Sequence, residues 1–469
     1  MNNIVYVGLS PHPPVIIPTI GKEELTKVEA TVTGMKKWAD EVRRAEPDTI
    51  VLISPHGTVF SDAITIRKGE RVQGNLADFG APQVKADWPV DVNLLEAIGL
   101  MAYREQVNVV SLDREEMQRL GAKWELDHGA IVPLWYLQEA GLDCALVSVN
   151  MGLLAVEELY AFGLAVQRAA GLLGRKVAVI ASGDLSHRLT PDAPSGFAPE
   201  GKEFDRRIKE NLELLQIEEI LRLPEELVEK AGECGLRPLI MALGALDGLD
   251  AQCEIFSYEG PFGVGYLVCG FKPQGPNPER ELLEKLIDRR EEEIAARRAR
   301  ESYPVKLARR SLEYYLRNGE ILDKPKDLPP ELEKAAGVFV SIKKHGQLRG
   351  CIGTTEPTQP TIAEEIIHNA IAAGTRDPRF WPVEEEELSQ LLYSVDILNP
   401  AERVNSLSDL DPRQYGVIVR KGRSSGLLLP DLPGVDTVEE QLRIAKQKAG
   451  INPMDQDVEI WRFTVTRYL

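Results

Sequence analysis

The chain has 469 residues, 43% of them hydrophobic and 6% aromatic, which is enough for two or three domains with cores of their own. Its net charge of −18 argues against a general nucleic-acid binder, and no apolar run approaches the ~18 residues that span a bilayer. The first residues lack a basic leader and the five cysteines form no CxxC pair, so we expect a reducing, cytoplasmic setting without a disulfide framework.

Residues 1–275 alternate between strand and helix patterns. The predicted strands are 4–9, 50–54, 144–150, 176–182 and 263–271, and the predicted helices are 22–46, 92–105, 129–140, 155–173, 201–214, 217–231 and 236–247. This alternation predicts an α/β domain with a parallel or mixed sheet. The segment 60–90 is expected to form a hairpin excursion from that sheet.

Two predicted strands end in the same tripeptide. One runs into Ser10-Pro11-His12 and the other into Ser54-Pro55-His56. A proline directly before the histidine holds φ and removes a donor, so the chain leaves the sheet at once. Ligand sites in open α/β sheets gather at the strand ends. We therefore predict that His12 and His56 are two ligands of one metal ion.

Further candidates for this site lie at a strand end and at helix starts. His128 follows Asp127 before an apolar helix, and His187 follows the strand 176–182 in Gly183-Asp184-Leu185-Ser186-His187. A single such histidine is usually structural, but four in these positions indicate a functional site. A third ligand could come from Glu233 or Cys234, because a helix N-terminus stabilises a carboxylate or a thiolate. Glu259 is a weaker candidate.

The composition changes after about residue 272. Residues 276–301 are predicted to be a charged helical linker whose mixed-sign side chains face solvent. Residues 302–469 form a further domain. Its predicted helices are 304–318, 359–374, 384–390 and 437–449, and its predicted strands are 337–344, 348–353, 391–399, 416–421, 424–429 and 459–468. Strands outnumber helices and some are adjacent, which favours a smaller α+β fold.

One motif stands out in this second domain. Arg349 and Cys351 alternate with glycines in Leu348-Arg349-Gly350-Cys351-Ile352-Gly353, where glycine permits close approach of a backbone or a ligand. The cysteine could be a nucleophile if a cation lowers its pKa. The alternative is a buried cysteine in a tight bend. Together with Arg376 and Asp377, these residues are our candidates for a cleft.

The ordered motifs of the first domain resemble the class III extradiol ring-cleavage dioxygenases of the LigB type, and are similar also to the Memo branch of that family. The resemblance implies an α/β sandwich of mixed sheet and helices. In the dioxygenases two histidines and a glutamate bind Fe(II) and leave positions open for O₂ and substrate. Carried over, His12 and His56 are the imidazole ligands and His187 is the acid–base histidine. His128 supports the ligands or contacts substrate, and Asp184 orients an imidazole or approaches the metal.

The two related families differ in the residue that provides the third metal ligand. Cys234-Gly235-Leu236-Arg237-Pro238 matches the Cys-Gly-x-x-Pro setting of Memo proteins, whereas ring-cleaving enzymes carry a carboxylate there. Glu233 could supply a carboxylate only with a shift of one residue, and successive helix residues point about 100° apart. We therefore favour Cys234, with Glu233 as the alternative. A thiolate would accept copper or zinc as well as Fe(II).

The second domain resembles the AMMECR domain family. The matching stretches are 348–353, Asp377-Pro378-Arg379-Phe380, Gly426-Leu427-Leu428-Leu429-Pro430 and 435–441. The resemblance covers about 302–469 and implies an α+β fold with a cleft, but no activity.

We therefore expect a fusion of a LigB-type or Memo-like metal-binding domain at 1–275, a linker at 276–301 and an AMMECR domain at 302–469. The leading hypothesis is an enzyme, a non-haem iron oxidoreductase acting on a small molecule such as an aromatic diol. The alternative is a Memo-like metal-binding scaffold without dioxygenase activity, and a third hypothesis is hydrolysis or lyase chemistry on the same metal. Both families occur beside a radical-SAM protein, which implies such a partner. Nucleic acid and membrane are not expected as partners, and a homo-oligomer is compatible with the sequence.

Overall fold

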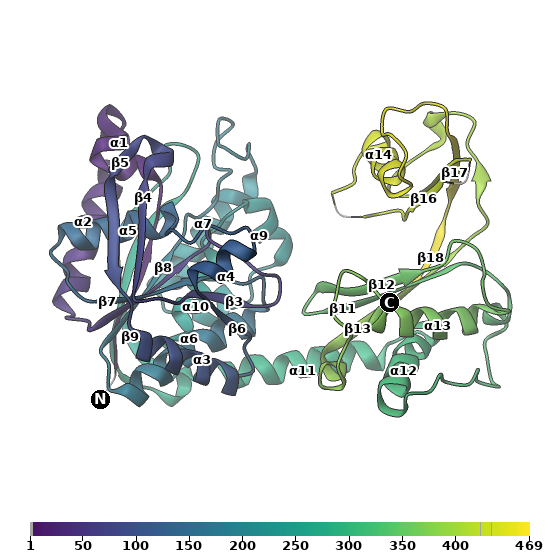
Figure 1. Ribbon diagram of the computed structural model, residues 1–469, viewed down its shortest axis with the longest axis horizontal. Coiled ribbons are helices and arrows are strands. Elements are labelled where there is room, and N and C mark those ends of the chain that lie inside the picture. The colour runs from purple at the N-terminus through teal and green to yellow at the C-terminus, as the bar shows by residue number, and fades with distance from the viewer. Residues whose placement is uncertain (1–2, 423, 433) are drawn as a thin grey trace. The chain divides into compact units, whose positions relative to one another are not determined.

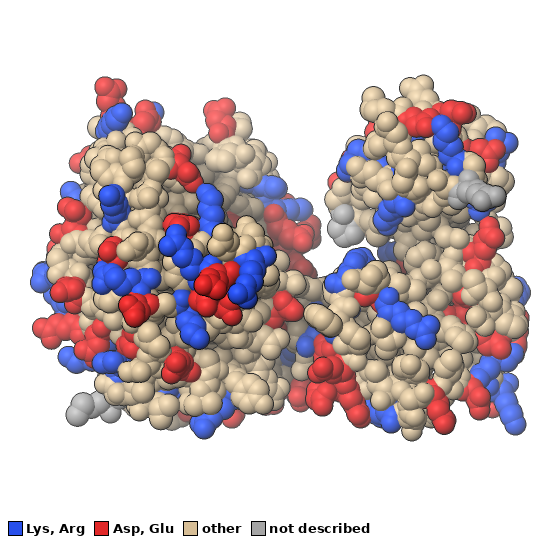
Figure 2. All heavy atoms as spheres, in the orientation of Figure 1, with Lys and Arg blue, Asp and Glu red and all other residues tan. Residues whose placement is uncertain are grey.

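The computed structural model describes residues 3–422, 424–432 and 434–469, and the chain divides into two compact units, Met1–Asp288 and Arg289–Leu469 (Figure 1). On the face shown in Figure 2, acidic and basic side chains are interspersed over each unit. Among the described residues, no helix is both long enough and apolar enough to cross a membrane.

The first unit is built around one eight-stranded sheet. In spatial order its strands are β6 (Val109–Leu112), β3 (Ile64–Arg67), β7 (Ala145–Asn150), β2 (Thr49–Ser54), β8 (Val177–Ser182), β1 (Ile4–Ser10), β10 (Tyr266–Pro276) and β9 (Leu249–Glu259). β2, β8 and β1 are parallel neighbours, whereas β10 runs antiparallel to β1. Every residue of β2 and β8 is buried, because both faces of the sheet are covered. The predicted mixed sheet is confirmed.

Helices cover both faces of this sheet. One face packs against helices that include α3 (Val92–Arg104), α6 (Val156–Leu173), α7 (Pro199–Glu213), α8 (Ile217–Leu221), α9 (Glu225–Ala231) and α10 (Leu236–Gly244). The other face packs against α2 (Glu29–Arg44), α5 (His128–Glu139) and the hairpin of β4 (Arg71–Leu76) and β5 (Ala81–Pro89). Trp38 of α2 is completely buried in that second core. The first unit is therefore the predicted α/β sandwich.

Several local expectations differ from the structure. In the segment 60–90 only β4 and β5 form the expected hairpin, whereas β3 belongs to the main sheet beside β6, a strand that was not predicted. Strand β9 is missing from the prediction because it lies at the edge of the sheet, where its side chains are only partly buried and acids interrupt the apolar pattern. The predicted helix 217–231 is two helices, α8 and α9. Pro224 stands directly before α9, and the residue before a proline is disfavoured in helical conformation.

The described residues of the second unit form two four-stranded sheets. The first, in the order β12 (Gln347–Gly353), β11 (Val338–Lys344), β13 (Leu391–Leu398) and β18 (Val465–Tyr468), packs one face on α12 (Tyr303–Asn318) and α13 (Ile362–Thr375). The second, in the order β14 (Glu402–Arg403), β17 (Glu459–Phe463), β15 (Gly416–Lys421) and β16 (Ser424–Leu428), packs on α14 (Val438–Lys448). The α+β prediction is confirmed.

Two elements around the second unit differ in detail from the sequence pattern. The predicted strand 459–468 is divided at Thr464 into β17 and β18, which belong to different sheets. The predicted helix 384–390 is a 3₁₀ helix, η6 (Glu385–Gln390). Helix α11 (Leu283–Ala299) contains the junction between the units and lies within the segment predicted as a charged linker.

Candidate metal centre

The carboxyl ends of three neighbouring strands carry the predicted site. Because β2, β8 and β1 run parallel and side by side, their last residues, Ser54, Ser182 and Ser10, lie at one edge of the sheet. His56 and His12 follow two of these ends after the predicted prolines, and Asp184 follows the third. The fold thus brings together side chains that are more than a hundred residues apart in sequence.

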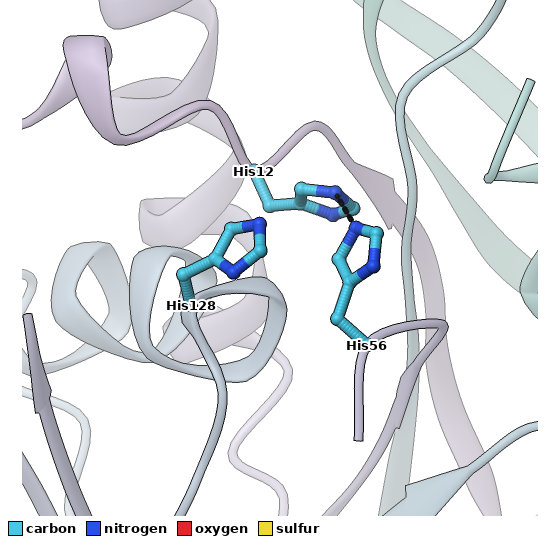
Figure 3. Close-up of side chains that lie close together, drawn as sticks. All are labelled: His12, His56 and His128. Carbon is cyan, nitrogen blue, oxygen red and sulfur yellow. Dashed lines mark hydrogen bonds between the residues drawn. The ribbon is translucent and has the colours of Figure 1, made fainter. Parts of the chain in front are cut away.

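Three histidines form a compact cluster at this edge (Figure 3). The Nε2 atoms of His12 and His56 are 2.9 Å apart, and the ring of His128 stacks on that of His56 with centroids 4.6 Å apart. One ligand nitrogen from each ring lies within 4.8 Å of the others. His128 is the first residue of α5, so it enters the cluster from a helix rather than from a strand end.

The hydrogen bonds of Ser182 determine which nitrogen of His12 is free. The Ser182 hydroxyl donates to the Gly129 carbonyl at 2.5 Å, and His12 Nδ1 lies 2.9 Å from the same oxygen. A hydroxyl has one proton, so His12 Nδ1 must carry the hydrogen and donate it to Ser182. The Nε2 lone pair of His12 therefore faces His56, unprotonated and available to a cation.

The Asp127-His128-Gly129 motif holds the second and third histidines in place. Asp127 Oδ1 accepts from the Ala130 N–H at 3.1 Å and from the Ser54 hydroxyl at 2.5 Å, so it both caps α5 and fixes the end of β2. A side chain at Gly129 would place its Cβ 2.6 Å from Ser54 Oγ and 3.3 Å from the His56 ring. Glycine is required there for the close approach of β2.

The rings of His12 and His128 are held in the neutral form. Burial, followed by repulsion from His56, lowers the pKa of His12 to about 3, and burial with the same kind of repulsion lowers that of His128 to about 4. Burial alone raises the pKa of Asp127, but the charge of the buried Arg67 and the hydrogen bond from Ser54 outweigh it, so the net pKa is lowered. Near neutral pH, His12 and His128 are therefore uncharged imidazoles beside the ionised carboxylate of Asp127.

Cys234 approaches His12 next to Asp184 and His187. Its Sγ lies 3.7 Å from His12 Nε2 and 3.7 Å from His187 Nε2, and it accepts the Asp184 N–H at 3.4 Å. Glycines make this approach possible, since a Cβ on Gly183 would lie 2.2 Å from the Cα of Gly235. Burial raises the pKa of the Cys234 thiol well above its ordinary value, so the free thiol is neutral.

Asp184 connects the segments that follow β8 and β1 by a hydrogen bond. Its Oδ1 accepts the His12 N–H at 2.9 Å, and its Oδ2 lies 4.0 Å from His12 Nε2. Burial raises the pKa of Asp184 to about 6. Burial lowers the pKa of the neighbouring His187, and the Asp184 charge partly offsets that effect. Asp184 and His187 are thus two proton-exchanging groups beside the cluster.

The two other carboxylates considered for the third ligand have different contacts. Glu233 Oε2 accepts the Leu236 N–H at 2.6 Å, at the start of α10. Glu259 Oε1 accepts from the N–H and the hydroxyl of Thr31, on α2.

The donor set fits a divalent or monovalent transition-metal ion. Neutral imidazole is a preferred ligand of iron, copper and zinc. Because His12 Nε2 carries no hydrogen, His56 Nε2 donates to it at 2.9 Å, and the other tautomer of His56 would turn both lone pairs toward one cation. A cation bound there would also stabilise the thiolate of Cys234. His12, His56 and either Cys234 or His128 could hold such an ion.

Two residues near the cluster are absent from the sequence prediction. Ser182 was detectable in principle, because it is a polar residue that ends a wholly apolar strand. Phe79 lies in η3 (Ala77–Phe79) between β4 and β5, with its ring centroid 5.2 Å from that of His128 and 42% of the residue exposed. Its place depends on how the hairpin folds over α5, which no local pattern indicates.

The second-unit candidates are only partly brought together. Cys351 N–H donates to Asp377 Oδ2 at 2.8 Å, so these two residues are neighbours. Arg349 is occupied by a two-pronged interaction with Glu387 and by the Trp381 carbonyl. Arg376 is exposed at the end of α13, and Arg379 takes the position beside Asp377 and Cys351.

Comparison with known families agrees with this architecture. Residues 6–269, more than half of the chain, match the family described as the catalytic LigB subunit of aromatic ring-opening dioxygenase. The chain belongs to the LigB family. Residues 305–468 match the AMMECR1 family, so the LigB domain is followed by an AMMECR1 domain, as the motifs predicted.

Similar proteins occur in bacteria and archaea. Protein CA_C1420 of Clostridium acetobutylicum is 40% identical over 462 residues, which cover 98% of each chain. A protein of Thermotoga maritima is 58% identical over 166 residues, covering 35% of this chain and 95% of its own. The crystal structure of the uncharacterized protein PH0010 from Pyrococcus horikoshii shares 38% identity, covers 35% of this chain and 88% of its own, and superimposes with a TM-score of 0.34.

Proposed function

We propose that the LigB domain is a metal-dependent oxidoreductase that binds Fe(II) through His12, His56 and Cys234 and acts on a small aromatic diol. The observation that carries this proposal is the pair of Nε2 atoms 2.9 Å apart, with the His12 tautomer set by Ser182. When bound, Fe(II) would supply a position at which a vicinal diol and O₂ meet and exchange electrons.

The surrounding side chains have separate tasks in this proposal. His187 is neutral near pH 7 because burial lowers its pKa, so its ring can accept a proton from a substrate hydroxyl and later return it. Asp184 holds the His12 backbone and its charge stabilises the protonated His187. The exposed Phe79 ring beside His128 offers an apolar surface to an aromatic substrate.

Anaerobic reconstitution with Fe(II) tests this function. The metal content is measured after gel filtration, and oxygen uptake is then followed on a panel of catechols. We expect one metal per chain and substrate-dependent oxygen consumption, which His187→Gln should reduce without removing the metal. Metal retention without oxygen consumption on any diol would contradict the oxidoreductase proposal.

The third ligand is resolved by a matched pair of variants. If Cys234 binds the ion, Cys234→Ala should lower the affinity for metal much more than His128→Ala. The reverse order would place the ion among the three histidines. Cys234→Ser retains a weaker donor of similar size and is the control for packing.

A second candidate function is metal binding without oxygenation, in the manner of a Memo-like protein that works with a radical-SAM partner. The observation that favours it is Cys234 Sγ at 3.7 Å from His12 Nε2, because a thiolate is a soft ligand suited to copper. On this alternative the reconstituted protein would bind copper more tightly than Fe(II) and leave catechols unchanged.

A further inference from the structure

One face of the first sheet of the AMMECR1 domain is not covered by α12 and α13. Val338, Val340 and Ile342 of β11 lie in the core beneath these helices, and side chains alternate along a strand, so Ser341 points to the opposite face. Ser341 is paired with Cys351 of β12 on one side and with Ser394 of β13 on the other. Three small polar side chains thus form a row across this face.

Polar groups contact both the thiol and the backbone of Cys351. The Ser341 hydroxyl donates to Cys351 Sγ at 3.2 Å, and the Cys351 carbonyl accepts from Arg379 Nη2 at 3.3 Å. The residue is only partly buried, so solvent reaches it. The Ser341 hydroxyl therefore helps to orient the sulfur of a partly exposed residue.

Arg379 is held beside the thiol by a buried carboxylate. Its Nε and Nη2 donate to Oδ1 and Oδ2 of Asp377 at 2.9 Å and 2.6 Å. Only 4% of Asp377 is exposed, and the hydrogen bonds from Arg379 lower its pKa to about 2, so the pair stays charged. The Arg379 side chain is itself 54% exposed, which leaves part of the guanidinium open to a ligand.

Lys448 adds a second positive charge. It is the last residue of α14, and its ammonium group interacts electrostatically with both Cys351 and Arg379. Much of the Lys448 side chain is exposed, but its partly buried ammonium group has a lowered pKa. Among the described residues, no carboxylate contributes to that pKa shift. Because Asp377 already balances Arg379, the charge of Lys448 is in excess.

We propose that Cys351 is a nucleophile in a surface site for small oxyanion-bearing electrophiles, which Arg379 and Lys448 attract and orient. A guanidinium fork matches the geometry of a carboxylate or phosphate, and an ammonium group adds a point charge. In the reaction the Cys351 sulfur donates an electron pair to the electrophilic carbon and forms an S–C bond. The bond from that carbon to the leaving group breaks, its electron pair departs with the leaving group, and the thiol proton passes to water.

Paired alkylation of the full-length chain tests the proposal. Iodoacetate is anionic and iodoacetamide is neutral, but both react with the same thiolate, so the ratio of their rates cancels the ionisation of the thiol and reports the local charge. Rates at each cysteine are measured by peptide mass spectrometry. At Cys351 we expect the ratio to exceed that of the same thiol in the urea-unfolded chain by on the order of tenfold, the scale of one unbalanced charge a few ångströms away. Equal ratios in the folded and unfolded chains would overturn the proposal.

Charge-removing variants identify the groups responsible. Lys448→Gln and Arg379→Gln should each lower the ratio at Cys351, whereas Lys306→Gln on the exposed face of α12 should leave it unchanged. Arg379→Gln could destabilise the loop that contains Asp377. If the melting temperature of that variant is lowered, Lys448→Gln is the decisive variant. An unchanged ratio in folded Lys448→Gln would contradict the assigned role of Lys448.

Competition distinguishes the ligand class. Acetate or inorganic phosphate is added while chloride keeps the ionic strength constant. Each should slow the alkylation of Cys351 by iodoacetate in a saturable way, and the stronger competitor indicates which oxyanion the site prefers. Slowing that chloride reproduces equally would show screening alone and would contradict a binding site.

Discussion

The histidine cluster of the LigB domain differs in its electrostatics from the group formed by Cys351, Asp377, Arg379 and Lys448 in the AMMECR1 domain. In the first, burial opposes the charged forms, lowering the pKa of His12 to about 3 and raising that of Asp184 to about 6. In the second, Asp377 and Arg379 are ionised and paired, with the pKa of Asp377 lowered to about 2.

The difference indicates which ligand each site can accept. Buried imidazoles that lie close together can be stabilised by a bound cation, because the cation compensates for the hydration that they lose on burial. A carboxylate that is already satisfied by an arginine has no need of a cation, and the additional lysine favours an anion. On the two proposals made above, the two domains of this chain bind ligands of opposite charge.

The largest expected effect comes from removing a converging donor. His12→Ala should abolish stoichiometric metal binding, because His12 is 2% exposed and its Nε2 faces both His56 and Cys234. Metal content after reconstitution measures this. Lys448→Gln is the matched control and should bind metal normally. Full metal retention in His12→Ala would place the metal elsewhere and remove one side of the comparison.

The next effect is an opposite response of two buried aspartates to pH. Burial raises the pKa of Asp205, which accepts from Ser186 N–H and the Tyr258 hydroxyl, to about 7. Its ionisation is therefore disfavoured in the folded state, and the native protein loses up to about 4 kcal/mol as pH rises from 4 to 7, at about 1.4 kcal/mol per pKa unit. Asp205→Asn should become more stable relative to the native protein over that range.

Asp377→Asn should behave in the opposite way. Because the folded pKa of Asp377 is lowered by Arg379, its contribution is present above the ordinary pKa and is lost as pH falls toward 2. The variant should be less stable than the native protein at pH 7 and approach it in acid. Hydrogen exchange read on peptides of each unit separates the two responses, and parallel pH profiles would refute the contrast.

A smaller effect is expected from Ser182→Ala. Without the hydroxyl, His12 Nδ1 loses its acceptor and the ring is free to change tautomer or rotate, which typically lowers metal affinity 10–100-fold while the stoichiometry is retained. Titration with a competing chelator measures this. Ser341→Ala, the equivalent loss in the AMMECR1 domain, should leave metal affinity unchanged. Equal affinities in Ser182→Ala and the native protein would mean that the tautomer is set by other contacts.

The smallest effect concerns substrate rather than metal. Phe79→Ala removes the exposed ring beside His128, and an aromatic pair contributes about 0.5–1.5 kcal/mol beyond area burial, so binding of an aromatic diol should weaken about two- to tenfold. Tyr103→Ala, on a side chain of α3 that is more exposed still, is the control. A weakened affinity for metal in Phe79→Ala would show that the ring supports the cluster instead.

Local signals in the sequence were sufficient for the architecture and for most of the candidate site. The apolar runs that end in Ser-Pro-His located β1 and β2 and placed His12 and His56 at their ends. This was possible because the effect of proline on a strand is local and does not depend on the rest of the fold. The same reasoning missed β9, whose pairing with β10 compensates for a weak apolar pattern. The motifs around Cys351 predicted a cleft, but they could not show that Arg349 would be bound by Glu387 and that Arg379 would face the thiol.

Residue types and spacing alone therefore determined the two domains, the α/β and α+β classes, and the set of histidines from which a metal site could be built. Only the tertiary structure decided how they meet. The order β2-β8-β1 places Ser182 between the two histidine-bearing strands, where its single proton selects the tautomer of His12. Gly183 and Gly235 let the Cys234 segment approach β8 closely. These contacts join residues far apart in sequence, and their geometry follows from packing of the whole sheet rather than from any local pattern.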